Sequence, residues 1–226
     1  MAMPYYVSPE QVMQDKAEYA RKGISRGRSI VAMEYDQGIL LVADNPSSLS
    51  KISEIYDKIA FAGAGKYSEF ENLRKAGIRH ADMKGYLYSR EDVTAKSLAN
   101  SYSQSLGTIF SQEMKPLEVE ILVVEVGRES AGNEMYRISF DGSIFDEKGF
   151  TAIGGKSEAL ILHLKNQYRR ASLKDALQLS VEAIESAYNQ TTSPAGLEVA
   201  TLDRGRPGRM FRRLGAKELT ELLQKE

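Results

Sequence analysis

The order of strand-forming and helix-forming segments is the feature that most restricts how this chain can fold. Runs rich in β-branched and aromatic residues occur in clusters, and amphipathic segments separate them. The predicted order is a helix, four strands, two helices, three strands, two helices, two strands and a short helix. Clustered strands favour antiparallel hairpins, and paired helices favour separate layers. The pattern therefore predicts an α+β fold, a four-layer α-β-β-α sandwich of two antiparallel sheets with an extra N-terminal helix.

The predicted boundaries lie where each apolar pattern starts and stops. Turn residues such as Asp36-Gln37-Gly38 separate the strands, and glycines follow several of the helices. The expected strands are residues 29–35, 39–44, 52–57, 59–64, 119–126, 136–140, 150–153, 197–203 and 209–214. The expected helices are residues 8–22, 72–83, 93–113, 158–170 and 173–188, with a last one from residue 217.

The first helix has clear start and stop signals but no place in the predicted layers. Ser8 can cap it, Pro9 suits its first position, and Gln11 completes a capping box with Ser8. Gly23 is the expected stop. Any functional interpretation therefore has to explain a helix that precedes the first hairpin and lies outside the layers.

Composition excludes several kinds of site. The chain has no cysteine and only two histidines, His80 and His163, so we expect no disulfide, thiol nucleophile, metal site or cofactor. A formal net charge of −1 gives no basic field for nucleic acid. The sequence shows neither a secretory signal nor an apolar run approaching the ~20 residues that span a bilayer, so a cytoplasmic protein without a membrane partner is expected.

The stretch "SPEQVMQDKAEYARKGISRGRSIVA" resembles the signature region of proteasome α-type subunits. The matching residues are Ser8-Pro9, Glu18-Tyr19-Ala20-Arg21 and Arg26-Gly27. The similarity continues in order through "GILLVAD", "LSKISEIYDKIAFAGAGK", "MKPLEVEILVVEV", "MYRISFDGS" and "LEVATLDRGRPGRMFRRL". Within that family, the chain most resembles the actinobacterial members.

The resemblance implies one domain over residues 1–226, with the fold of the N-terminal-nucleophile hydrolases. Residues 1–7 would be a gating tail, residues 8–23 the N-terminal helix and residues 28–226 the sandwich. It implies a non-catalytic subunit that forms outer rings of seven and binds neighbouring α subunits and proteasome β subunits. AAA+ ATPases or other activators would dock on it through their C-terminal tails.

Catalytic β-type relatives carry a threonine at the start of the first strand, and this chain lacks one there. Aligning the hairpin on Asp44 places Arg28 at the position of the threonine and Lys51 near that of the catalytic lysine. A guanidinium group cannot serve as the nucleophile. The alternative is a self-processed peptidase that uses Ser29. A one-residue step in a strand turns the side chain to the opposite face, so Ser29 is expected to point away from Asp44 and Lys51.

The resemblance also implies an activator-binding site at Lys51, Pro9 and Gly27. The ammonium group of Lys51 would bind the C-terminal carboxylate of an activator tail in a pocket between adjacent subunits. Without the resemblance, Lys51 would instead be expected to pair with Glu54 or Asp57 on the surface.

The gate is expected at the N-terminal tail, where Ser8-Pro9 forms the turn that an activator shifts. The preceding residues are short and mostly apolar, as suits a segment that can order or disorder. Many α-type subunits carry Tyr-Asp-Arg near the N-terminus to order the open gate, and this chain has no such motif. The expected gate residues are Pro4, Tyr5, Tyr6, Val7, Ser8 and Pro9.

Overall fold

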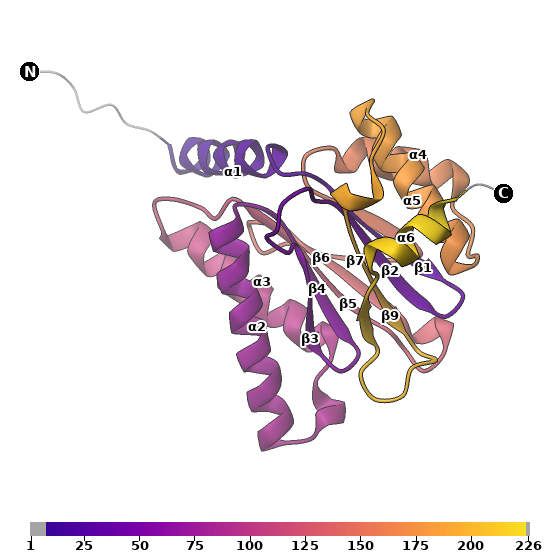
Figure 1. Ribbon diagram of the computed structural model, residues 1–226. Coiled ribbons are helices and arrows are strands. Elements are labelled where there is room, and N and C mark those ends of the chain that lie inside the picture. The colour runs from indigo at the N-terminus through magenta and orange to yellow at the C-terminus, as the bar shows by residue number, and fades with distance from the viewer. Residues whose placement is uncertain (1–7, 225–226) are drawn as a thin grey trace, which may run out of the picture.

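Two five-stranded antiparallel sheets pack face to face, with helices over both outer faces (Figure 1). This arrangement is seen in a computed structural model that describes residues 8–224. The strand orders are β10-β9-β2-β1-β8 in the first sheet and β3-β4-β5-β6-β7 in the second. The predicted four-layer α-β-β-α sandwich is confirmed.

The elements have the following bounds. The first sheet contains β1 (Ile30–Tyr35), β2 (Gly38–Asp44), β8 (Phe150–Ile153), β9 (Leu197–Asp203) and β10 (Phe211–Arg213). The second contains β3 (Ile52–Tyr56), β4 (Ile59–Gly65), β5 (Val119–Glu125), β6 (Glu134–Ile138) and β7 (Ile144–Glu147). The α-helices are α1 (Pro9–Ser25), α2 (Tyr67–Leu87), α3 (Ala95–Gln112), α4 (Ser157–Gln167), α5 (Leu173–Tyr188) and α6 (Ala216–Leu223). Short 3₁₀ helices lie at Arg90–Asp92, Ser130–Gly132 and Pro194–Gly196.

The period-two alternation of β1 explains why the layers form. Ile30 and Ala32 face the second sheet, where they join a core cluster with Ala62 and Leu122. Val31 and Met33 of the same strand point the other way, into a cluster with side chains of α4 and α5. Both faces of β1 and β2 are thus covered, which is why their sequences are nearly continuous apolar runs.

The prediction and the structure differ at β7 and at α2. The strand β7 was not predicted, because Phe145 at this sheet edge is 42% exposed and the segment lacks a buried alternation. The helix α2 is longer than predicted and continues past Gly85, where we expected it to end. At Gly85 the helix lies close to Tyr56, with the position of a missing Cβ 3.1 Å from the ring carbon that carries the hydroxyl. This glycine therefore serves a close approach and does not end the helix.

The helix α1 lies across one end of the sandwich (Figure 1) and continues through the predicted stop at Gly23 to Ser25. Ser8 caps it, since its Oγ accepts from the backbone N–H of Gln11 at 3.2 Å. The Gln11 side chain donates to Asp15 rather than back to Ser8, so the predicted reciprocal box is half made. On its inner face, Ala20 and Ile24 pack with Phe140. A small apolar cluster thus holds the helix against the sandwich.

Candidate functional site

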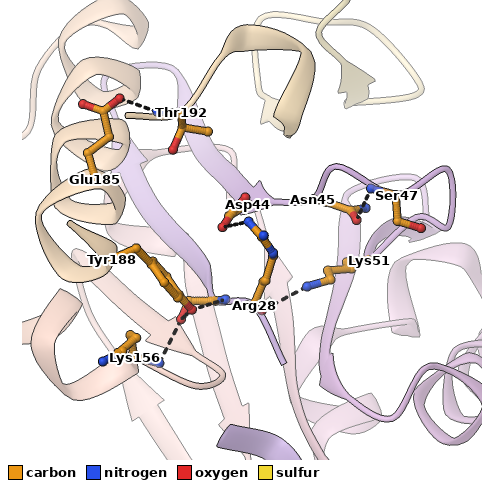
Figure 2. A network of polar contacts seen from close by, with 10 residues as sticks. Arg28, Asp44, Asn45, Ser47, Lys51, Lys156, Glu185, Tyr188 and Thr192 are labelled. Atoms are coloured by element: carbon orange, nitrogen blue, oxygen red, sulfur yellow. Dashed lines mark hydrogen bonds and ion pairs between the residues drawn. The ribbon is translucent and has the colours of Figure 1, made fainter. Parts of the chain in front are cut away.

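The candidate site is built by the β1–β2 hairpin and the loop that follows it. Antiparallel pairing of Ile30 with Ala43 places the residues before β1 beside the end of β2, so Arg28 meets Asp44. The loop at residues 45–50 then returns the chain, and Lys51 lies on the other side of Arg28 (Figure 2). The predicted neighbourhood of Arg28, Asp44 and Lys51 is therefore present in the structure.

Arg28 occupies the centre of this group. Its Nη1 donates to Oδ2 of Asp44 at 2.6 Å, and the Asp44 side chain is only 7% exposed while that of Arg28 is 47% exposed. The carboxylate is therefore buried against a cation that remains open to solvent on one side.

Lys51 is bound from several directions. Its Nζ donates to the backbone carbonyl of Arg28 at 3.0 Å. Burial lowers the pKa of Lys51, the nearby Arg28 guanidinium lowers it further, and the carboxylates of Asp44 and Glu198 oppose the shift. A lysine in this setting is a desolvated cation that gains from an additional anionic partner.

The alternative pairing of Lys51 with Glu54 or Asp57 is wrong. Glu54 binds Arg209, with Nε to Oε2 at 2.7 Å, and Asp57 binds Arg90, with Nη2 to Oδ1 at 2.6 Å.

Glu198 on β9 was not identified from the sequence, although it binds both ends of the loop. Its carboxylate accepts from the side-chain amide of Asn45 at 2.7 Å and from the backbone N–H groups of Lys51 at 2.8 Å and Ile52 at 3.1 Å. The guanidinium of Arg213 binds the same carboxylate at 2.5 Å. Nothing near Glu198 in the sequence marks it, because its partners lie 15 to 153 residues away.

Ser29 lies on the opposite side of the chain from Asp44 and is fully buried. Its Oγ is 2.9 Å from the hydroxyl of Tyr188 and accepts from the backbone N–H of Lys156 at 3.1 Å. Figure 2 shows Tyr188 and Lys156 away from the Asp44 side. Ser29 therefore acts as a structural hydrogen-bonding group between β1 and the helices α4 and α5.

Comparison with known proteins decides the family. A family model described as "Proteasome subunit" matches residues 24–202. The chain belongs to the proteasome subunit family. The "Proteasome subunit alpha" of Streptosporangium roseum is 56% identical over 232 residues, covering 99% of this chain and 87% of that protein. Those of Thermomonospora curvata and Thermobifida fusca are 54% and 53% identical, covering 99% of this chain and 98% and 92% of their own lengths.

The expected resemblance to α-type proteasome subunits is thus confirmed over nearly the whole chain, and the relatives named come from actinobacteria. The similarity begins before the sandwich and includes α1. The alternative of a self-processed peptidase is not favoured, since this helix and the buried Ser29 both belong to the folded subunit.

The structure brings only two of the three expected activator-binding residues together. Gly27 directly precedes Arg28, and its carbonyl accepts from the backbone N–H of Gly155 at 3.0 Å. Pro9 lies at the far end of α1, about 25 Å away for a helix of this length. Ser8 and Pro9 form the start of α1, whereas the expected gate residues Pro4, Tyr5, Tyr6 and Val7 lie outside the described residues.

Two other kinds of site are absent from residues 8–224. In this part of the chain, no cluster of three or more histidine, aspartate or glutamate side chains is arranged to hold a metal ion. No helix there is long and apolar enough to cross a lipid bilayer.

Proposed function

We propose that this chain is the non-catalytic α-type subunit of a 20S proteasome core, in which rings of seven copies cap rings of β subunits. One observation carries the proposal: Arg28 lies between Asp44 and Lys51, its guanidinium is permanently charged, and the resemblance aligns it with the nucleophile of catalytic relatives. The similarity to proteins named as α subunits supports the same assignment.

The backbone before β1 supports retention of the N-terminal segment. The carbonyls of three successive residues accept hydrogen bonds, Gly27 from the Gly155 N–H, Arg28 from the Lys51 ammonium and Ser29 from the Asp44 N–H. A nucleophile at the end of a cut chain needs a free amine. Here that position is inside a continuous, bonded segment.

We also propose that Lys51 and Gly27 form a tail site for activators, completed by α1 of a neighbouring subunit. A chain terminus presents a carboxylate, and Lys51 is a half-buried ammonium with donors to spare. Pro9 cannot reach Lys51 within one subunit, so its expected role would be exerted across the ring. Weak binding at each tail site is compensated when several tails dock on one ring.

The two ends of the molecule suit two different partners. The helix α1, which the candidate gate precedes in the chain, lies at one end of the sandwich, and α2 runs from that end toward the other (Figure 1). At the distal end of α2 four large apolar side chains are exposed by 59% to 87%: Met83, Tyr86, Leu87 and Tyr88. Grouped exposed apolar residues mark protein–protein contacts. We assign this end to the β subunits.

The intact mass of the chain in a peptidase-active particle, purified with its β partner, tests the non-catalytic assignment. The expected mass keeps every residue before Ser29. A chain that begins at Ser29 would show self-processing and would overturn the proposal.

Removal of residues 1–7 tests the proposed gate. The truncated particle is expected to hydrolyse short peptides faster, because entry to the chamber is no longer blocked, while particle size stays the same. Equal turnover by the truncated and complete particles would remove the gate from the proposal.

A further inference from the structure

We infer that Arg28 is a second cation of the tail site, and that it binds the activator's C-terminal carboxylate together with Lys51 while Asp44 competes for it. The inference rests on the proposed docking of tails at Lys51. It gives a binding role to the residue at the nucleophile's position, where a permanent charge rules out catalysis.

The geometry leaves Arg28 with unused donors. Its guanidinium contacts Asp44 through Nη1 alone, and within residues 8–224 neither Nε nor Nη2 has a hydrogen-bond partner. The side chain is 47% exposed, so solvent and an incoming ligand can reach it. A planar fork with free donors suits a carboxylate, which can accept two parallel hydrogen bonds.

Lys51 and Arg28 lie close enough to act on one group. The Lys51 ammonium is 3.0 Å from the backbone carbonyl oxygen of Arg28, on the side of the chain that faces the loop at residues 45–50 (Figure 2). The guanidinium of Arg28 is also near enough to lower the pKa of Lys51, because the two cations repel each other. A carboxylate bound between them would relieve this repulsion.

Asp44 limits how strongly the site can bind a carboxylate. Its buried carboxylate holds Nη1 of Arg28, so an incoming carboxylate has to share the guanidinium with it. A neutral chain end, such as an amide, brings no charge to offset that competition. The two cations therefore favour a free, ionised terminus over a neutral one, and Asp44 reduces that preference.

The test uses assembled core particles and a fluorescein-labelled peptide that copies the C-terminus of a proteasomal AAA+ ATPase. The peptide is made with a free carboxylate and as the C-terminal amide, and both affinities are measured by anisotropy at pH 6.5. Arg28→Gln is expected to weaken the free-acid peptide about fivefold to tenfold and to leave the amide unchanged. Arg209→Gln, which removes an exposed arginine paired with Glu54, is the matched control and is expected to change neither affinity.

Asp44→Asn is expected to change the affinity for the free-acid peptide in the opposite direction, and it leaves Arg28 in place. It frees the guanidinium, so the free-acid peptide is expected to bind about twofold to threefold more tightly. A purely structural pair would give no gain on losing Asp44. This variant also replaces the first if particles carrying Arg28→Gln fail to assemble.

The outcomes separate this inference from the docking proposal. If Lys51→Ala abolishes discrimination between acid and amide while Arg28→Gln and Asp44→Asn leave it unchanged, docking stands and the role of Arg28 is overturned. Equal weakening of both peptides by Arg28→Gln also overturns it. If Lys51→Ala changes nothing and the acid binds no better than the amide, the docking proposal itself fails.

Discussion

At the start of β1, two adjacent residues have opposite surroundings. Arg28 points toward Asp44 and solvent, and Ser29 points into the layer between β1 and the helices α4 and α5. Alternation of side chains in an extended backbone is enough to produce this contrast. A functional residue and a structural residue can therefore be neighbours without sharing any role.

Ser29→Ala tests that separation. The change leaves the Lys156 N–H without its acceptor and removes the side-chain contact to the Tyr188 hydroxyl, which still accepts from the Ser29 N–H at 3.1 Å, so unfolding should become easier by about 1–3 kcal/mol. Peptide turnover by assembled particles should be unchanged. Calorimetry and a peptidase assay check the two parts, with Tyr188→Phe as the control that removes the same contact from the other side. Loss of turnover in fully assembled Ser29→Ala particles would revive the nucleophile alternative.

The lowered pKa of Lys51 predicts how tail binding depends on pH. Only the protonated ammonium attracts a carboxylate, so affinity is present below the pKa in the folded subunit and is lost as the pH rises through it. Because that pKa lies below the ordinary 10.5, the loss should begin at lower pH than for an exposed lysine. Anisotropy titrations at increasing pH measure it.

Lys51→Arg is the control for this titration, since guanidinium stays charged throughout the accessible range. Its affinity should be flat over the pH range in which the native site weakens. A native affinity that is equally flat would show that the charge of Lys51 does not govern binding.

At the scale of residues, the sequence predicted contacts between residues that are close in the chain. Hairpin pairing follows from alternation and a turn, so the meeting of Arg28 with Asp44 was predictable. The partners Glu198 and Tyr188 were not, because each is brought in by an element more than 140 residues away. Such contacts depend on how the layers pack and leave no local mark in the sequence.

At the scale of elements, Gly23 shows how packing overrides a local rule. A glycine that follows basic residues often marks the end of a helix, yet α1 continues past Gly23 to Ser25. A Cβ at Gly23 would lie 2.7 Å from the Cβ of Glu118, just before β5. The glycine therefore allows α1 to approach the sandwich, which the sequence alone could not reveal.

Gly23→Ala should consequently destabilise the attachment of α1. In an open helix the change would stabilise by about 1 kcal/mol, but here it forces the helix away from Glu118. Hydrogen exchange of the α1 amides should become faster. The double variant Gly23→Ala with Glu118→Gly should recover much of the protection, because the opposing side chain is gone. Slower exchange in the single variant would mean that helix propensity dominates.

At the scale of the whole molecule, strand clusters and helix pairs were sufficient to predict the sandwich. The buried stripes leave few ways to cover two sheets, so the layers followed from the pattern. The pattern did not predict which end of the molecule exposes apolar side chains. The exposed residues at the end of α2 have the same helical spacing as buried ones, and only the fold shows that nothing in the described chain covers them.

Tyr86→Asp tests the assignment of that end to β subunits. Tyr86 is 87% exposed, so the subunit should fold normally, but a carboxylate in an apolar contact should block co-assembly with β subunits. Native mass spectrometry of co-expressed subunits measures this. Met114→Asp is the matched control, because Met114 is 95% exposed beside α1, at the other end. Complete particles formed by the Tyr86 variant would place the β contact elsewhere.

The three bonded carbonyls before β1 also bear on how such a subunit can change over evolutionary time. A single codon change at Arg28 could supply a hydroxyl, but not the free amine, since the chain there continues into α1. Cutting the chain to create that amine would discard α1 and every contact it makes. Activity would thus require two changes, a hydroxyl at position 28 and the loss of α1, and neither change alone is sufficient.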